Sequence, residues 1–149
     1  NIELIKHRMT FQTIGPDKVN QLRHCRFFKD IDAVREHMMK HAAIVRPKFE
    51  LVLNTLKKEL SAVDCSWRNP KGGYFVSFYA PKGCAKKIVA LCKDAGLILT
   101  PAGATYPYGN DPDDSNIRIA PTFPPITELE TALKLFTVAV KIAAIEKIL

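Results

Sequence analysis

Residues 70–79, Pro-Lys-Gly-Gly-Tyr-Phe-Val-Ser-Phe-Tyr, pass directly from a turn into a strand. A proline followed by paired glycines favours a turn at 69–73, since glycine tolerates backbone angles that other residues avoid. The aromatic and β-branched run 74–79 is typical of a β-strand. On the N-terminal side of the turn, residues 65–68 predict a short strand of their own. The stretch therefore predicts two strands joined by a tight connection.

Toward the C-terminus, a helix, two further strands and a long loop follow. Residues 81–95 predict a helix that Gly96 ends as a C-terminal cap. Strands are predicted at 97–100 and 116–120, and an irregular loop rich in Gly, Pro and Asp separates them at 101–115. The side chains of the predicted helix that face inward are Ile88, Val89, Leu91 and Cys92.

The last helix is predicted to begin at Thr127, where Glu130 three residues later completes a capping box. Its apolar positions are Leu129, Leu133, Phe136, Val140 and Ile148. Strands and helices in this order predict an α+β fold, in which a small, mainly antiparallel sheet carries helices on one face.

The N-terminal residues also follow a helical pattern. A helix or helix end is predicted at 1–13, then a break at 15–17, then a short helix at 18–28. Pro16 suits the first position of that short helix, because its missing N–H is not needed there. Since the chain opens in the middle of a helical pattern, we expect it to be part of a longer protein.

The strongest periodic signal lies in residues 31–60, where apolar side chains recur every three or four positions and predict one long helix. Pro47 lies inside this helix. Proline removes a backbone donor and clashes with the preceding turn, so a kink is expected near 43–46. The apolar stripe comprises Ile31, Val34, Met38, Ala42, Val45, Phe49, Val52, Leu56 and Leu60.

Composition and charge narrow the class of protein. The chain has 149 residues, 47% of them hydrophobic and 25% charged, which is an ordinary globular balance. No apolar stretch is long enough to span a bilayer. The net charge of +7 is scattered along the chain without aromatic interleaving, which argues for a solvated basic surface and against nucleic acid. The four cysteines, without a Cys-x-x-Cys pair, predict reduced thiols in a cytoplasmic protein.

Two groups of residues are candidates for chemistry. His37 and His41 are spaced for a shared metal, but Met38 stands where a zinc protease needs glutamate, so we predict no metal site. Arg118 lies between Ile117 and Ile119 in a predicted strand. A guanidinium keeps its charge in proteins, so this one needs water or an anion as partner. An arginine on an edge strand that faces solvent is the alternative.

Three segments in order resemble the small domain of class I/II, fold-type I aminotransferases, which depend on pyridoxal 5'-phosphate. They are Pro70-Lys71-Gly72-Gly73-Tyr74-Phe75, then Pro101-Ala102-Gly103-Ala104-Thr105-Tyr106, then the strand bearing Arg118. The segment 13–21 and the long helix resemble the end of the family's large domain and its interdomain helix. The details are most similar to the aspartate-aminotransferase-like or MocR-like branch.

The resemblance implies a role for each site residue. Arg118 would bind the α-carboxylate of an amino-acid or 2-oxo-acid substrate, and Thr105 and Tyr106 would line the substrate pocket. Asn20 would approach the active site or a homodimer interface. The resemblance also divides the chain into the end of a large cofactor-binding domain at 1–30, an interdomain helix at 31–62 and the small domain at 63–149.

The sequence also departs from the family's pattern. None of its four serines begins the Ser-x-x-Lys or Ser-x-Ser-Lys stretch that carries the cofactor lysine. That lysine is expected upstream, so this chain would hold no catalytic residue and be inactive alone. The loop also departs from the family's pattern at Ala102 and at the acidic residues Asp111, Asp113 and Asp114. The resemblance therefore does not identify which amino acid is the substrate. Two alternatives remain: a non-catalytic basic module that binds anions or nucleic acid, and the effector or dimerisation domain of an aminotransferase-like regulator.

Overall fold

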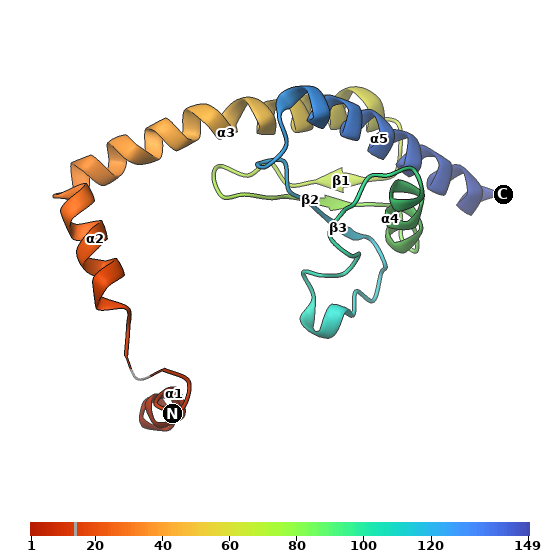
Figure 1. Ribbon diagram of the computed structural model, residues 1–149. Helices are drawn as coiled ribbons and strands as arrows, with labels where there is room; N and C mark the ends of the chain where they lie inside the picture. Colours follow the sequence, from red (N-terminus) through yellow and green to blue (C-terminus); the bar gives the residue numbers. More distant parts are fainter. Residues whose placement is uncertain (14) are drawn as a thin grey trace. The chain divides into compact units, whose positions relative to one another are not determined.

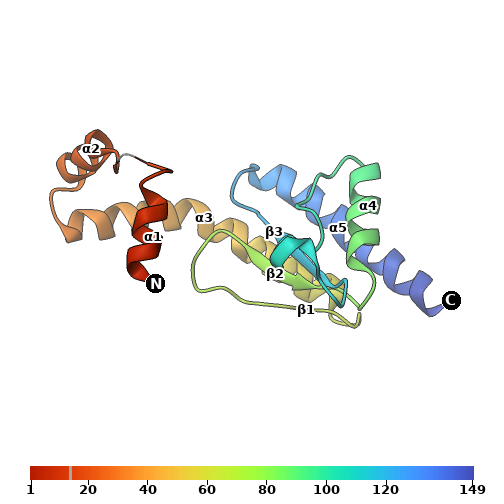
Figure 2. The same cartoon turned by 90° about the horizontal axis from the view of Figure 1, so that it is seen from below.

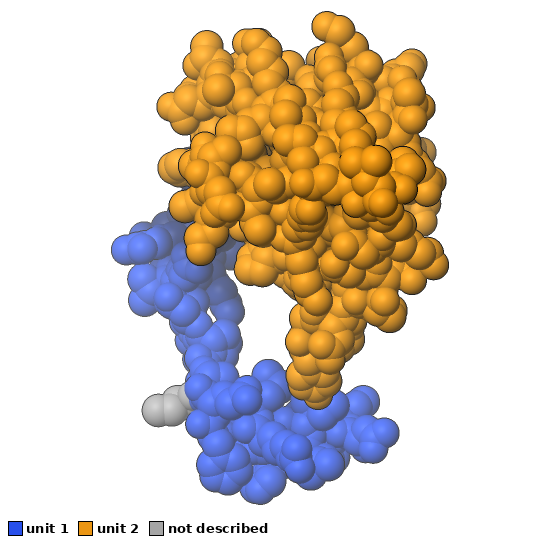
Figure 3. Space-filling view, turned by 90° about the vertical axis from the view of Figure 1, so that its right-hand side faces the viewer, with its two compact units in different colours: residues 1–42 blue, residues 43–149 orange. Residues whose placement is uncertain are grey.

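A computed structural model describes residues 1–13 and 15–149 of the chain. The chain forms two compact units, residues 1–42 and 43–149, which Figure 3 shows in different colours. Ile14, in the predicted break between the first two helices, lies outside the described residues.

The first unit contains α1 (Ile2–Met9), α2 (Lys18–Phe28) and the beginning of α3 (Ile31–Leu60). The helix predicted at 18–28 is confirmed. The expected place of Pro16 is wrong, because Asp17 is the N-cap and its carboxylate accepts a hydrogen bond from the backbone N–H of Asn20 at 2.9 Å. None of the described residues in 1–42 is buried, and most of the large apolar side chains of this unit are exposed.

The long helix is confirmed as α3, which continues as a helix through Pro47. The bend expected at 43–46 stays a prediction. The part of the apolar stripe that lies in the second unit enters a core, where Val52, Leu56 and Leu60 are fully buried. The C-terminal half of the apolar stripe therefore packs into the hydrophobic core of the second unit.

The sheet of the second unit is small and antiparallel, as predicted. Its strands are β1 (Ser66–Trp67), β2 (Val76–Tyr79) and β3 (Asn116–Ile119), in the spatial order β1-β2-β3. In the register of β2 and β3, Val76 lies opposite Ile119 and Ser77 lies opposite Arg118.

The strand predicted at 97–100 is wrong. These residues pair with no strand in the part of the chain that the structure describes. Leu97 and Leu99 pack partly against the core, whereas Ile98 is 86% exposed. The alternation typical of a strand is thus present, but a strand also needs a neighbour to complete its backbone hydrogen bonds. The sequence pattern shows the alternation of buried and exposed side chains, but it does not show whether a neighbouring strand is available.

Helices cover one face of the sheet. The C-terminal half of α3 and α5 (Ile126–Ile148) lie on the same side of the strands, and α4 (Ala85–Asp94) packs against α5 (Figure 1). The rings of Phe78 on β2 and Phe136 on α5 meet edge to face at 5.2 Å between centroids. This arrangement confirms the predicted α+β fold with helices on one face. In the described residues, no helix is both long and apolar enough to cross a membrane.

The ends of α4 and α5 differ partly from the predictions. Gly96 does end α4, with φ +87° and a hydrogen bond from the N–H of Leu97 to the carbonyl of Cys92 at 2.8 Å. However, α4 begins only at Ala85, because residues 81–83 form a turn in which Gly83 has φ +77°.

The predicted capping box of α5 is also wrong. The helix begins at Ile126 after Pro125, which makes no side-chain cap, so Thr127 already lies inside the first turn. Leu129, Leu133, Phe136 and Val140 are buried as expected, but Ile148 is 85% exposed. The last residue of α5 buried in the core is Ala143, so the final turn runs past the sheet.

Candidate functional site

The strand alternation creates a polar face on the sheet, opposite the helices. Val76 and Phe78 of β2 and Ile117 and Ile119 of β3 are buried in the core. Successive side chains of a strand point to opposite faces, so Ser77 and Arg118 must lie on the other face. The loop 101–115 with the short helix η1 (Pro107–Gly109) lies on this side of the sheet (Figures 1 and 2).

Arg118 is held on this face by Phe75. The guanidinium carbon of Arg118 lies 4.4 Å from the centroid of the Phe75 ring, within the range of a cation–π contact. Its Nε atom is buried and has no hydrogen-bond partner in residues 1–13 and 15–149. Although β3 is an edge strand, Arg118 is therefore not a freely solvated edge arginine. A charged group with an unmet donor is suited to an anionic ligand.

A chain of hydrogen bonds joins the loop to the two strands beside Arg118. The hydroxyl of Thr105 donates to Asn116 Oδ1 at 2.5 Å. Asn116 Nδ2 in turn donates to Ser77 Oγ at 2.9 Å and lies 3.4 Å from the carbonyl oxygen of Phe78. Because Asn116 is only 2% exposed, these bonds replace water that it cannot reach. They bring Thr105 to the face that carries Arg118.

Asp111 holds the C-terminal end of the loop. One of its carboxylate oxygens accepts hydrogen bonds from the N–H groups of Ser115 at 2.8 Å and Asn116 at 2.7 Å, and the other accepts from Asp113 N–H at 3.1 Å. Burial alone would raise the pKa of Asp111, but these three N–H donors, with Lys86 nearby, lower it below its ordinary value. In its ionised form, the Asp111 side chain therefore holds the C-terminal end of the loop in place.

Gly103 allows the loop to fold tightly. It has φ +77°, and a Cβ atom built on it would lie 2.6 Å from the carbonyl oxygen of Gly109. Its own N–H donates to the carbonyl of Asn116 at 3.2 Å, which ties the loop to β3. Any larger residue at position 103 would push this part of the loop away from the backbone at Gly109.

Tyr106 lies in the same loop and is half-buried. Burial raises the pKa of its phenol, and electrostatic repulsion from Asp111, Tyr79 and Asp113 raises it further. The phenol therefore stays protonated at neutral pH and can act as a hydrogen-bond donor. The loop that carries Thr105 and Tyr106 is thus joined through Asn116 to β3, the strand that bears Arg118.

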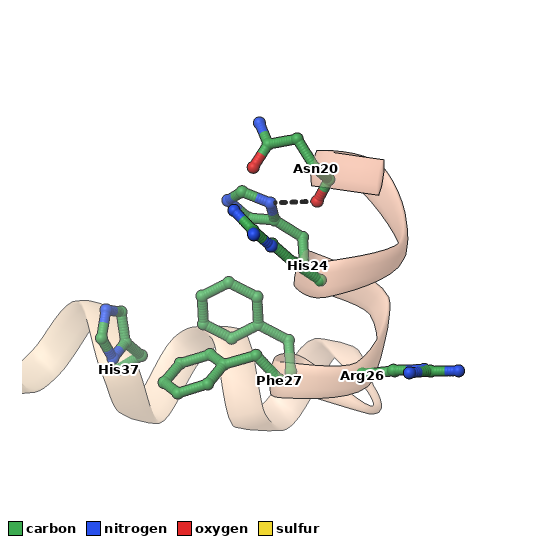
Figure 4. A pocket seen from close by; sticks show the side chains of 7 residues that line it. Asn20, His24, Arg26, Phe27 and His37 are labelled. Atoms are coloured by element: carbon green, nitrogen blue, oxygen red, sulfur yellow. Dashed lines mark hydrogen bonds between the residues drawn. The ribbon is translucent and has the colours of Figure 1, made fainter. Parts of the chain in front are cut away.

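Asn20, the fourth predicted site residue, belongs to the first unit. Its backbone carbonyl accepts a hydrogen bond from His24 Nδ1 at 2.8 Å, as Figure 4 shows. The side chain lines a pocket between α2 and α3, where Arg26 points away from the rings of Phe27 and His37. The lining residues of this pocket are Asn20, Arg23, His24, Arg26, Phe27, Phe28 and His37.

The two histidines considered for a metal are ordinary members of an aromatic cluster. The ring centroids of His37 and His41 lie 4.5 Å apart, and His37 also meets the edges of Phe27 and Phe28. Among the described residues, no group of three metal-ligating side chains comes together.

Three residues of the polar face were missed by the sequence reasoning: Phe75, Ser77 and Asn116. The signal for them was present, because the alternation that buries Ile117 also places Asn116 and Arg118 on one face. Ser77 follows from the same alternation in β2, whereas its pairing with Arg118 depends on the register between distant strands.

The family model described as aspartate amino-transferase matches residues 1–149. An aspartate aminotransferase of Corynebacterium glutamicum is 46% identical over 134 residues, which are 89% of this chain and 31% of that protein. The crystal structure of an aspartate transaminase from the same species superposes with a TM-score of 0.89 at 42% identity, over 99% of this chain and 35% of that one.

A more distant structure shares the fold. The α-aminoadipate aminotransferase of Thermus thermophilus, solved with N-(5'-phosphopyridoxyl)-L-leucine, has a TM-score of 0.64 at 20% identity, over 74% of this chain and 28% of that one. The chain thus spans about a third of the length of the curated relatives that it matches.

Proposed function

This chain belongs to the aspartate aminotransferase family, and from that membership we propose that it forms the C-terminal part of a pyridoxal-phosphate-dependent amino acid:2-oxo acid aminotransferase of the aspartate type. In this proposal, residues 1–30 end the large domain, 31–62 form the interdomain helix and 63–149 form the small domain. The complete protein is a cytoplasmic homodimer, and Asn20 lies at its active site or dimer interface.

The observation that carries the proposal is the state of Arg118. Its guanidinium rests on Phe75, and its buried Nε has no partner in the described residues. A planar guanidinium offers two parallel N–H donors to a carboxylate, so it selects the orientation of a ligand as well as its charge. Arg118 therefore binds the α-carboxylate of the substrate.

The neighbours of Arg118 complete a carboxylate site. Ser77 supplies a hydroxyl that Asn116 and Thr105 orient through hydrogen bonds, and Tyr106, on the same loop as Thr105, supplies a phenol whose pKa is raised. This set of one cation and neutral donors suits a carboxylate. When bound, pyridoxal phosphate supplies an electron sink for the bonds at the substrate's α-carbon. The task of this chain is to hold the substrate so that the correct bond faces that sink.

The cofactor lysine is expected outside residues 1–149, and the chain alone is therefore inactive. If the 149-residue chain is mixed with pyridoxal phosphate and borohydride, we expect no stoichiometric lysine adduct. A stable adduct at a single lysine, found by peptide mass mapping, would contradict this assignment. The family membership would be unaffected by that result.

The role of Arg118 is tested in the full-length protein. Arg118→Ala is expected to cost about 2–5 kcal/mol in kcat/KM for L-aspartate, because it removes one member of a charge pair. Arg118→Lys keeps the charge but loses the fork, so it should recover only part of the loss. The control is Arg68→Lys, since Arg68 is exposed and the variant keeps the charge. Equal kcat/KM for Arg118→Ala and wild type would show that Arg118 does not bind the substrate.

A further inference from the structure

Ser77 and Arg118 are direct neighbours across β2 and β3. Residues opposite each other in an antiparallel pair have Cβ atoms about 4.5–5.5 Å apart and share a face of the sheet. A ligand that Arg118 binds therefore lies on the face of the sheet that also carries the hydroxyl of Ser77. Ser77 is half-buried, so this hydroxyl is not lost in bulk solvent.

The hydrogen bonds around Ser77 all run in one direction. Thr105 Oγ1 donates to Asn116 Oδ1, which leaves the NH₂ group of Asn116 turned toward Ser77. Asn116 Nδ2 then donates to Ser77 Oγ. The hydroxyl hydrogen of Ser77 has no acceptor in the part of the chain that the structure describes. The series Thr105, Asn116, Ser77 thus ends in a free donor beside Arg118.

Asn116 keeps this direction fixed. A reversed amide would place its NH₂ group against Thr105 and its oxygen against Ser77, where it would accept the serine proton. The observed orientation is favoured because Asn116 Nδ2 also lies 3.4 Å from the carbonyl oxygen of Phe78, which can only accept. With Asn116 almost fully buried, water cannot replace these partners.

We propose that the hydroxyl of Ser77 is a second donor to the substrate carboxylate, beside Arg118, and that Asn116 and Thr105 are positioning residues that aim it. This inference rests on the proposed role of Arg118. A carboxylate offers about four acceptor positions, and a guanidinium fork uses two of them. The Ser77 hydroxyl takes a third and fixes the tilt of the carboxylate against the Phe75 ring.

The test uses the full-length enzyme with L-aspartate and 2-oxoglutarate, and the affinity for succinate, an unreactive carboxylate probe, measured by calorimetry. Ser77→Ala is expected to lower kcat/KM roughly 10- to 100-fold and to weaken succinate binding in parallel, as expected for loss of a hydrogen bond to a charged group. Ser77→Thr keeps a hydroxyl and should restore most of both. Ser66→Ala on β1 is the matched control, because Ser66 is exposed.

Arg118→Lys, measured beside these variants, separates the two levels of the proposal. If Arg118→Lys is impaired and Ser77→Ala behaves like Ser66→Ala, the role of Ser77 is overturned while that of Arg118 stands. If neither variant changes kcat/KM or succinate affinity, the carboxylate does not bind on this face and both assignments fail.

Thr105→Val tests the positioning series. Valine keeps the shape of threonine but lacks its hydroxyl, so Asn116 loses the donor that sets its orientation. We expect Thr105→Val to lower kcat/KM and succinate affinity about as much as Ser77→Ala does. The double variant, Thr105→Val with Ser77→Ala, should be no worse than Ser77→Ala alone. Losses that multiply in the double variant would show that Thr105 does not act through Ser77.

Discussion

The guanidinium carbon of Arg118, a residue of β3, lies 4.4 Å from the centre of the ring of Phe75, which flanks β2. Phe75 immediately precedes β2 and is 45% exposed, so it supports the cation from the open side of the sheet. The ring limits the positions that the guanidinium can occupy before a ligand arrives. Preorganisation of this kind reduces the entropy lost on binding.

Replacing Phe75 by leucine should therefore weaken substrate binding. A cation–π contact at a partly exposed site contributes about 0.5–1 kcal/mol, so Phe75→Leu should raise KM roughly two- to fivefold with little change in kcat. Steady-state kinetics of the full-length enzyme provide the measurement. Tyr74→Leu, at the neighbouring exposed position, should leave KM unchanged. If the two variants behave alike, Phe75 does not support Arg118.

Gly103 and Gly83 allow backbone strain and steric overlap to be separated. Both have φ +77°, but a Cβ atom meets the carbonyl oxygen of Gly109 at 2.6 Å only at position 103. Gly83→Ala should cost about 1 kcal/mol for the left-handed backbone. Gly103→Ala should cost at least about 3 kcal/mol and also lower kcat/KM, because the displaced loop carries Thr105. Urea unfolding of both variants gives the comparison, and equal losses would disprove the close approach.

Asp111 predicts an acid-sensitive loop. Its pKa is lowered in the folded protein, so the stabilisation is fully present above the ordinary pKa of 3.8 and is lost as pH falls through the folded value. Asp111→Asn removes this ionisation. We expect the urea midpoints of wild type and variant to differ most at neutral pH and to converge toward pH 3. A difference that is constant over this range would show that the hydrogen bonds from the loop N–H groups to residue 111 do not depend on the charge of its side chain.

The half-buried thiol of Cys65 and the buried thiol of Cys92 should resist alkylation. Burial raises the pKa of both Cys65 and Cys92 to about 11, and the charge of Asp64 adds to the shift at Cys65. At pH 8 roughly a thousandth of each thiol is ionised, so iodoacetamide should react far more slowly than with the same cysteines in denaturant. Peptide mapping after timed alkylation distinguishes the two sites. Reaction of Cys92 at the denatured rate would contradict its burial.

The sidedness of the sheet could be predicted from local pattern. Alternation in 74–79 and 116–120 separates the core-facing residues from those beside Arg118, because the side-chain period of a strand is two residues. Residues 97–100 show the limit of the same rule. Their alternation is real, but no strand pairs with them in the described chain, and partner availability is not a local property.

Helix ends were predicted less well than helix faces. The buried line from Leu129 to Val140 follows from the helical period, whereas the capping box at Thr127 was wrong. Several residues near a helix start satisfy the same capping rule, and the position of Pro125 in the folded turn decides among them.

From the sequence alone one could predict the long helix through Pro47, three of the four predicted strands, the face on which Arg118 lies and the family resemblance. These depend on periodicity and on residue type, which act over a few positions along the chain. The folded structure was needed to show that Ser77 lies opposite Arg118 and that Phe75 lies against its guanidinium. It was likewise needed to show the joining of Thr105 to both strands through Asn116. Most of these contacts join segments far apart in the sequence, and they depend on strand register and loop closure, which core packing sets for the unit as a whole.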